Sequence, residues 1–249
     1  MGQQITHQII ASDESELSSA FCRSAHPYHN KIVRGSANIQ YSNDITTGLS
    51  ASQVVIDFSL PVVSLSLLDS AIESKTAILI GTTGFSKTQL SSIEKASKKI
   101  PILLAPNTSI GVNVTLSLIA KAASLLDQQA NIEIIEAHHK HKIDSPSGTA
   151  LKMAEVICEA THTDLSKRAV YSRHQSKTAR SEDQIGFSVI RAGEIIGEHK
   201  VMFALNNEII SIEHKAQNRR CFAEGAVKAA VWLARQDNGL YSMQDFLAD

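Results

Sequence analysis

Short apolar runs alternate with longer amphipathic segments between residues 53 and 105. Three of these runs are rich in branched aliphatic residues, as buried strands are: "QVVIDF" (53–58), "TAILIGTTGF" (76–85) and "IPILLAPNTS" (100–109). The segments between them predict helices, the first with Pro61 in its first turn and the second with a serine cap. This alternation predicts a parallel sheet with crossover helices.

The pattern changes after about residue 110. Between residues 185 and 216, short strand-like runs are separated by glycines and by Asn206-Asn207, a pair that predicts a hairpin turn. The remaining predicted elements are a helix at 113–126, a strand at 131–139, a helix at 149–160 that begins at Thr149, and a final helix at 221–236. We therefore expect a mixed or antiparallel sheet with helices on one side.

The composition is that of an ordinary globular protein and excludes several classes. Of 249 residues, 43% are hydrophobic and 20% charged, and the net charge is −1, so no basic field predicts binding to nucleic acid or a membrane surface. No apolar run approaches the roughly 20 residues that span a bilayer, and the start "MGQQITHQII" does not resemble a secretory signal. Cys22, Cys158 and Cys221 form no Cys-x-x-Cys pair, which favours a reducing, cytoplasmic setting without structural zinc.

Three polar turns follow the predicted parallel strands, at 57–59, 81–84 and 105–108. In open parallel sheets, ligands bind beyond the carboxyl ends of the strands. The glycines, hydroxyls and backbone amides of these turns suit a long ligand such as a dinucleotide. The alternative is that they are ordinary turns, which often use glycine and threonine.

The stretch "EAHHKHKIDSPSGTALKMAE" (136–155) concentrates three histidines and two lysines within 138–142, just before a glycine turn. One hypothesis is a metal site through His138 and His141, although no carboxylate or cysteine stands at a supporting spacing. A second is a solvated basic loop with one histidine in the core. The third is an acid/base site that handles an anion, since histidine transfers protons near neutral pH and the amide-rich start of a helix binds carboxylates.

The sequence around this stretch resembles the 4-hydroxy-tetrahydrodipicolinate reductase (dihydrodipicolinate reductase) family. "EAHHKHKIDSPSGTAL" closely matches the signature of that family. Further segments look like family segments in the same order: "VVIDFSLP", "LIGTTGF", "APNTSIGVNV", "GFSVIRAGEIIGEHKVMFA" and "IEHKAQNRRCFAEGAVKAAVWL". The resemblance covers nearly the whole chain from about residue 53 and is looser before it.

The resemblance implies an α/β protein with two domains. A Rossmann-type dinucleotide-binding domain would comprise 1–109 and 220–249, and a smaller mixed-sheet domain for substrate binding and oligomerisation would comprise 110–219. It also implies a cytoplasmic homotetramer of the diaminopimelate route to lysine. The reaction would be hydride transfer from NADH or NADPH to a small cyclic dicarboxylate, with loss of water.

The resemblance also implies roles for individual residues. His138 would be the catalytic acid/base and Lys142 the proton donor, while His139, Gly148, Thr149 and Arg219 would bind the substrate and its carboxylates. The cofactor would contact the two turns that follow the second and third predicted strands, at Gly81, Thr82, Thr83, Ala105, Pro106, Asn107 and Thr108. No metal is expected.

The sequence departs from the family pattern at its start. A Rossmann domain begins with a strand and a glycine-rich turn that cradles the pyrophosphate, and Met1-Gly2 corresponds to the last two residues of that turn. One explanation is a true start about 16 residues earlier, roughly the length of a strand and a turn. The other is a truncated relative that cannot hold NAD(P)H and acts only as a binding or assembly protein.

A second departure concerns the choice of cofactor. An acidic residue about twenty positions after the glycine turn usually binds the ribose hydroxyl of NAD, but Cys22 and Arg23 stand there. Cysteine is a weak acceptor, whereas arginine pairs with the 2′-phosphate of NADP. We therefore expect NADPH to serve at least as well as NADH.

Overall fold

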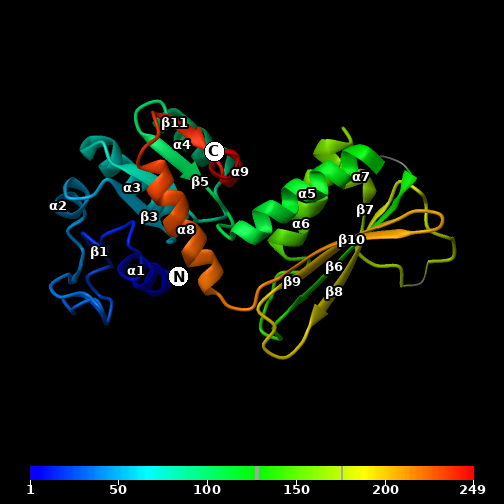
Figure 1. The fold of residues 1–249 in the computed structure, drawn as a ribbon, viewed down its shortest axis with the longest axis horizontal. Coiled ribbons are helices and arrows are strands. Elements are labelled where there is room, and N and C mark those ends of the chain that lie inside the picture. The colour runs from blue at the N-terminus through cyan, green and yellow to red at the C-terminus, as the bar shows by residue number, and fades with distance from the viewer. Residues whose placement is uncertain (127–128, 175) are drawn as a thin grey trace. The chain divides into compact units, whose positions relative to one another are not determined.

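The computed structural model describes residues 1–126, 129–174 and 176–249. The chain forms two compact units, each built around its own sheet (Figure 1). The first comprises Met1–Ile110 together with Arg220–Asp249, and the second comprises Gly111–Arg219.

The main sheet of the first unit is parallel, which confirms the fold class predicted from the alternating pattern. Its order is β11-β5-β4-β3, and every neighbouring pair is parallel. The strands are β3 (Val54–Asp57), β4 (Ala77–Ile80), β5 (Pro101–Leu104) and β11 (Gly239–Tyr241). Because all four run the same way, the turns that follow β3, β4 and β5 lie at one edge of the sheet.

Helices cover both faces of this sheet, because its central strands are apolar on both sides. Ile78, Ile80 and Ile102 pack with α3 and α4, and alternate residues such as Leu79 and Leu103 pack with α8. The helices of this unit are α1 (Gly2–Ile10), α2 (Ile45–Ser50), α3 (Pro61–Ser74), α4 (Lys87–Ala96), α8 (Arg220–Leu233) and α9 (Met243–Ala248).

Local signals set where these helices begin. Pro61 is the first residue of α3, where its missing N–H costs no hydrogen bond. Ser86 caps α4 by accepting from the Gln89 amide, and the Gln89 side chain accepts in return from the Ser86 amide.

The N-terminal segment starts directly in α1, which packs its Ile5 side chain against Ala223 and Val227 of α8. Two short strands, β1 (Ala20–Phe21) and β2 (Tyr41–Ser42), pair in parallel as a sheet of their own.

The second unit contains the mixed sheet that the sequence predicts. Its order is β10-β9-β6-β8-β7, with β6 parallel to β8 and antiparallel to β9. The strands are β6 (Asn131–His138), β7 (Ala169–Val170), β8 (Ile185–Arg191), β9 (Glu198–Ala204) and β10 (Ile209–Lys215). Asn206-Asn207 lies in the β9–β10 hairpin loop, as predicted.

Helices pack on one face of this sheet, as predicted (Figure 1). They are α5 (Ile110–Leu126), α6 (Gly148–Ala160) and α7 (Leu165–Arg168). The core between them includes Ile119, Ile134, Met153, Phe187 and Phe203. The predicted start of α6 at Thr149 is wrong by one residue, because Ser147 is the N-cap and accepts from the Ala150 amide.

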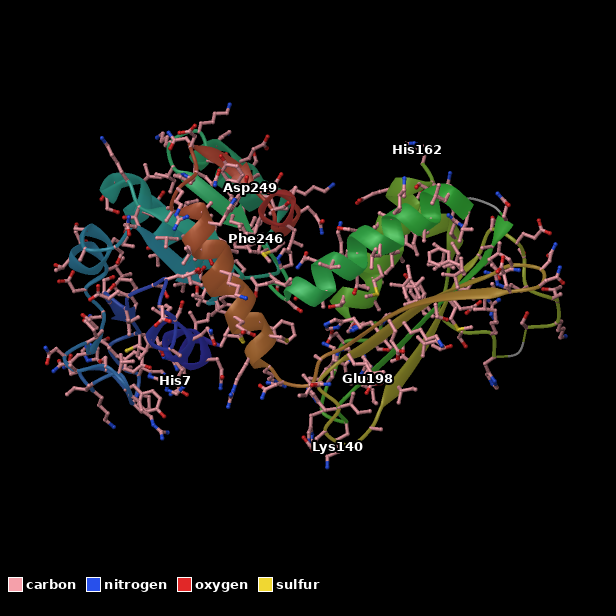
Figure 2. The ribbon with its side chains drawn as sticks, viewed as in Figure 1. His7, Lys140, His162, Glu198, Phe246 and Asp249 are labelled. Carbon is pink, nitrogen blue, oxygen red and sulfur yellow. The ribbon has the colours of Figure 1, made fainter. Side chains whose placement is uncertain are left out.

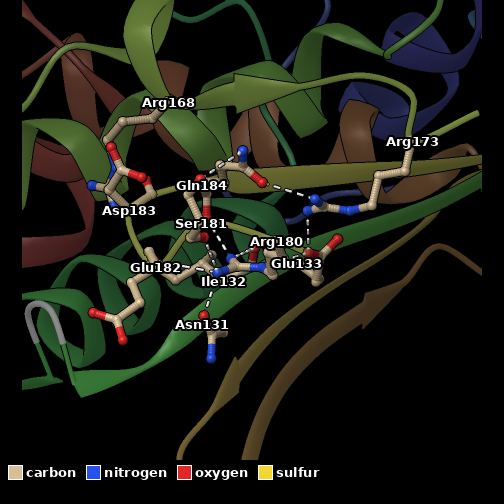
Figure 3. Close-up of polar contacts among 10 residues, drawn as sticks. All are labelled: Asn131, Ile132, Glu133, Arg168, Arg173, Arg180, Ser181, Glu182, Asp183 and Gln184. Atoms are coloured by element: carbon tan, nitrogen blue, oxygen red, sulfur yellow. Dashed lines mark hydrogen bonds and ion pairs between the residues drawn. The ribbon is translucent and has the colours of Figure 1, made fainter. Parts of the chain in front are cut away.

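Arg180 ties the segment before β8 to the strand beside it. Its guanidinium donates to the carbonyls of Ile132 and Gln184 and forms an ion pair with Glu133 at 3.2 Å (Figure 3). Arg173 reaches the same Glu133 oxygen at 2.9 Å. No described helix is both long and apolar enough to cross a membrane.

Candidate active site

The helix-facing side of the five-stranded sheet changes from apolar to polar along β6. Ile132 and Ile134 are in the core, and Glu136 and His138 follow them on the same face because strand residues alternate. The strand register places Arg191 of β8 beside His138 and His199 of β9 beside Glu136. Four titratable side chains thus meet where β6 ends, next to the start of α6.

Glu136 is the centre of this cluster. Its side chain is 1% exposed, and its Oε1 accepts from Arg191 Nη2 at 2.9 Å and from the Ser147 amide at 3.0 Å. Its Oε2 is in close contact with Nδ1 of His138. Burial alone would raise the pKa of Glu136, but the Arg191 and Ser147 hydrogen bonds and the adjacent His138 more than offset this and lower it. Glu136 is therefore a carboxylate at neutral pH.

His138 is neutral under the same conditions. Burial lowers its pKa, the nearby Lys142 and Arg191 charges lower it further, and Glu136 opposes both effects without cancelling them. A Cβ at position 197 would lie 3.1 Å from His138 Nε2, so Gly197 leaves room beside that nitrogen.

The start of α6 is joined to the cluster through Ser147 and His199. Ser147 Oγ lies 3.1 Å from Nε2 of His199, and the His138 and His199 rings meet edge to face with centroids 5.0 Å apart. Burial, with smaller effects from its neighbours, lowers the pKa of His199 to about 4. His199 is therefore a neutral hydrogen-bonding side chain.

The other predicted substrate residues of the second unit surround this buried cluster. Strand β6 ends at His138, so His139 to Lys142 form a turn in which the Lys142 amide donates to the His139 carbonyl at 3.1 Å. Lys142 is paired with Asp144 at 2.9 Å, and the exposed Arg219 approaches the His139 ring at 3.5 Å. Lys140, in the same turn, has 60% of its side chain exposed and lies 3.9 Å from Glu194 (Figure 2).

Gly148 and Thr149 form the first turn of α6, directly after the Ser147 cap. The position that a Cβ would occupy at Gly148 has no atom within 4 Å. A carboxylate can therefore approach this backbone, and the positive end of the helix dipole favours it.

In the first unit, a buried network joins the turns that follow β3 and β4. The Thr82 hydroxyl donates to Asp57 Oδ2 at 3.1 Å and accepts from the Ser59 amide at 2.9 Å, and Ser64 also donates to Asp57 Oδ2. The Phe58 ring occupies the space that a side chain at Gly81 would need. The Thr82 hydroxyl therefore links the turn after β4 to the turn after β3.

The remaining predicted cofactor residues divide between exposed and buried positions. Thr83 and Pro106 are exposed, and Gly84 has a φ of +87° with no atom within 4 Å of a would-be Cβ. The buried Thr108 hydroxyl donates to the Phe222 carbonyl at 2.7 Å. Arg23 is exposed and lies two residues after the end of β1. The accessible backbone at this sheet edge fits an extended ligand such as a nicotinamide cofactor.

The cluster also has the spacing of a metal site. Glu136, His138 and His199 each offer a ligand atom within 4.8 Å of the others. However, both Glu136 oxygens already accept hydrogen bonds, and one of the donors is the cationic Arg191. The Glu136 carboxylate therefore already has its hydrogen-bond donors, and the positive charge of Arg191 opposes the binding of a metal cation beside it.

Comparisons with known proteins match the sequence to one family. The model described as "Dihydrodipicolinate reductase, N-terminus" matches residues 1–108, and the one described as "Dihydrodipicolinate reductase, C-terminus" matches residues 111–247. The chain belongs to the dihydrodipicolinate reductase family. The resemblance found in the sequence is thereby confirmed.

Two curated members of the family are similar over nearly their full length. The 4-hydroxy-tetrahydrodipicolinate reductase of Nitrosospira multiformis is 45% identical over 251 residues, and the match covers 99% of this chain and 93% of that protein. The enzyme of the same name from Buchnera aphidicola is 41% identical over 254 residues, with the same coverage of both chains.

Solved structures support the same fold. A dipicolinate-bound dihydrodipicolinate reductase from Paenisporosarcina sp. TG-14 gives a TM-score of 0.75 at 22% identity, covering 97% of this chain and 92% of that one. An amine dehydrogenase from Mycobacterium smegmatis gives 0.62 at 10% identity, covering 96% and 92%.

Sequence reasoning missed three members of the cluster, namely Glu136, Arg191 and His199. Strand periodicity could have found Glu136, since it stands two residues before His138. The sequence carries no comparable signal for Arg191 and His199, which reach the cluster only through the pairing of β8 and β9 with β6.

Proposed function

We propose that this chain catalyses the NAD(P)H-dependent reduction of 4-hydroxy-tetrahydrodipicolinate to tetrahydrodipicolinate in the diaminopimelate route to lysine. The observation that carries the proposal is its 45% identity, over nearly its full length, to a reductase of that name. In this reaction the substrate gains a hydride, and its hydroxyl group takes up a proton and leaves as water.

We assign the proton chemistry to His138 and Lys142. His138 is neutral at neutral pH, so its free ring nitrogen is ready to accept a proton. Lys142 has three N–H donors, and its positive charge is close enough to His138 to lower the pKa of that histidine. Asp144 holds the Lys142 ammonium at 2.9 Å, which supports a fixed position for a proton donor.

We assign the substrate carboxylates to the groups around this pair. The first-turn backbone at Gly148 and Thr149 suits one carboxylate, because the helix dipole and the open approach at Gly148 both favour an anion there. Arg219 and His139, which approach each other at 3.5 Å, suit the second. The Paenisporosarcina protein binds dipicolinate, a cyclic diacid of the class that we propose for this site.

We assign the cofactor to the carboxyl edge of the parallel sheet. A bound nicotinamide cofactor supplies the hydride. Gly81, Thr83, Gly84 and the turn from Ala105 to Thr108 would line its site, while Thr82 keeps that edge in shape through Asp57. We further propose that the exposed Arg23 favours the 2′-phosphate of NADPH, so that NADPH serves at least as well as NADH.

We propose that the chain assembles as a homotetramer through the helix-free face of the five-stranded sheet. The strand register places Ile135, Ile190, Met202 and Ile209 on that face, and Ile190 and Ile209 are 48% and 58% exposed. The same face carries Glu133 and Lys200, and such a mixture of apolar and charged side chains is compatible with a subunit interface. We also propose a cytoplasmic location, which the free cysteines Cys22, Cys158 and Cys221 support.

The direct test is an activity assay on the full chain. Purified protein is mixed with 4-hydroxy-tetrahydrodipicolinate and either NADPH or NADH, and cofactor oxidation is followed at 340 nm while mass spectrometry detects the product. We expect oxidation that depends on the substrate, with kcat/KM for NADPH at least equal to that for NADH. A folded chain that binds the cofactor yet gives no tetrahydrodipicolinate would overturn the proposal.

A further inference from the structure

We infer that Glu136 is a positioning residue, whose carboxylate holds His138 with its proton on Nδ1 and leaves Nε2 to exchange a proton with the substrate. The inference rests on the acid/base role proposed above for His138. It adds a residue that contacts neither substrate nor cofactor and acts through the histidine.

Hydrogen bonds to both oxygens hold the Glu136 carboxylate in one orientation. Arg191 and the Ser147 amide donate to Oε1 at 2.9 and 3.0 Å, and these donors come from β8 and from the cap of α6. The second oxygen contacts Nδ1 of His138. Since the side chain is 1% exposed and bonded from three directions, it cannot turn away from the ring.

The tautomer of His138 follows from this contact. A carboxylate only accepts hydrogen bonds, so Nδ1 must carry the proton whenever the two groups are bonded. In a neutral imidazole the other nitrogen then has a free lone pair. That nitrogen, Nε2, faces Gly197. A side chain at position 197 would crowd it, since its Cβ would lie 3.1 Å from Nε2, so glycine leaves this nitrogen accessible.

The charge of Glu136 also offsets the cations around the ring. The titratable groups facing His138 are Glu136 on its own strand, Arg191 on β8, His199 on β9 and Lys142 in the following turn. Arg191 and Lys142 disfavour a proton on the ring, and the carboxylate opposes them. Without Glu136, His138 would bind its second proton less readily.

A purely structural role explains this arrangement less well. Burying a carboxylate is costly, and well-packed apolar side chains often stabilise a fold as much as a buried ion pair does. Besides the Arg191 guanidinium, Glu136 bonds the ring of His138 and the Ser147 amide at the cap of α6, and both of these adjoin the proposed substrate site.

The test compares Glu136→Gln with Glu159→Gln in the full chain. Both changes remove one carboxylate from the second unit, but Glu159 lies at the far end of α6 with 67% of its side chain exposed, and it pairs with Lys152 at 3.4 Å. We expect Glu136→Gln to lower kcat about 10- to 100-fold with an unchanged Kd for NADPH, since positioned acid/base catalysis is worth about 10²- to 10⁴-fold. Glu159→Gln should keep kcat within about twofold of the unaltered chain.

The pH profile separates positioning from simple structural support. Because the carboxylate raises the pKa of His138, Glu136→Gln should move the limb of the kcat profile that His138 controls to lower pH. Glu136→Asp keeps the charge, so its limb should stay closer to that of the unaltered chain even if its rate falls. Limbs that coincide in all three proteins would contradict the inference.

Direct observation of the ring covers the case in which Glu136→Gln does not fold. In the unaltered chain with ¹⁵N-labelled histidine, assigned by difference from His138→Asn, we expect Nδ1 of His138 to be protonated and Nε2 unprotonated at pH 7.5. The opposite tautomer would overturn the inference. If His138→Asn retains near-normal kcat, the proposed function of His138 fails; if it is inactive while Glu136→Gln is normal, only the role of Glu136 fails.

Discussion

His199 makes the second unit sensitive to acid, and the structure gives the size of the effect. Its folded pKa is about 4, whereas an exposed histidine titrates near 6.5. Between these values the unfolded chain binds one proton more than the folded chain, so acidification favours unfolding. At about 1.4 kcal/mol for each pH unit, neutral His199 contributes about 3 kcal/mol to the free energy of unfolding. About 2 kcal/mol of this contribution is lost between pH 7 and pH 5.

The variant His199→Gln isolates this contribution. Glutamine does not titrate, and its amide can still reach the Ser147 hydroxyl that lies 3.1 Å from the histidine ring. We expect the variant to lose about 2 kcal/mol less stability than the unaltered chain between pH 7 and pH 5. His174→Gln is the matched control, because His174 is exposed and belongs to the same unit.

Hydrogen exchange measures this stability in the second unit itself. Protection of the β6 and β9 amides, corrected for intrinsic exchange at each pH, gives the free energy of opening the sheet that carries His199. An equal loss of protection in the unaltered chain and in His199→Gln would show that His199 is not the source of this sensitivity to acid. The control should follow the unaltered chain.

Three further predictions concern other parts of the account. Lys142→Gln should lower kcat at least about tenfold with little change in NADPH affinity, because the amide cannot donate a proton; unchanged turnover in steady-state assays would remove Lys142 from the mechanism. Gly225→Ala should destabilise the first unit by about 1–3 kcal/mol, because a Cβ there clashes with the Thr108 carbonyl. Thermal unfolding followed by the fluorescence of Trp232, the single tryptophan, measures the loss of stability, and an unchanged Tm would contradict the prediction. Dialysis against EDTA should leave kcat unchanged, because both Glu136 oxygens already have hydrogen-bond partners and one of these is the cationic Arg191. Activity lost on chelation and restored by Zn²⁺ would favour the metal hypothesis instead.

The sheet of the first unit was predictable because the sequences of its strands differ clearly from those of their neighbours. β4 is buried along its whole length, and its sequence, like those of β3 and β5, is a run of aliphatic residues between helix signals. Local rules also found Pro61 and Ser86 at helix starts, because caps depend on a few neighbouring residues. The start of α6 was misplaced because Ser147 and Thr149 are both acceptable caps.

The candidate site was predictable only in part. His138 stood out in a dense run of histidines and lysines, but the groups that give it a defined tautomer and a low pKa come from β8, β9 and α6. Arg191 lies 55 residues beyond Glu136 and reaches it only through strand register. A sequence does not state register, since register depends on the packing of the whole sheet.

The proton chemistry proposed for His138 is tested most directly by measuring the turnover of His138→Asn together with its affinity for NADPH. With 4-hydroxy-tetrahydrodipicolinate and NADPH, we predict a fall in kcat of about 100-fold or more, while the Kd for NADPH from fluorescence titration stays within about twofold. Near-normal turnover by His138→Asn would contradict the account, because the site would then reduce its substrate without the side chain on which the proposed proton chemistry depends.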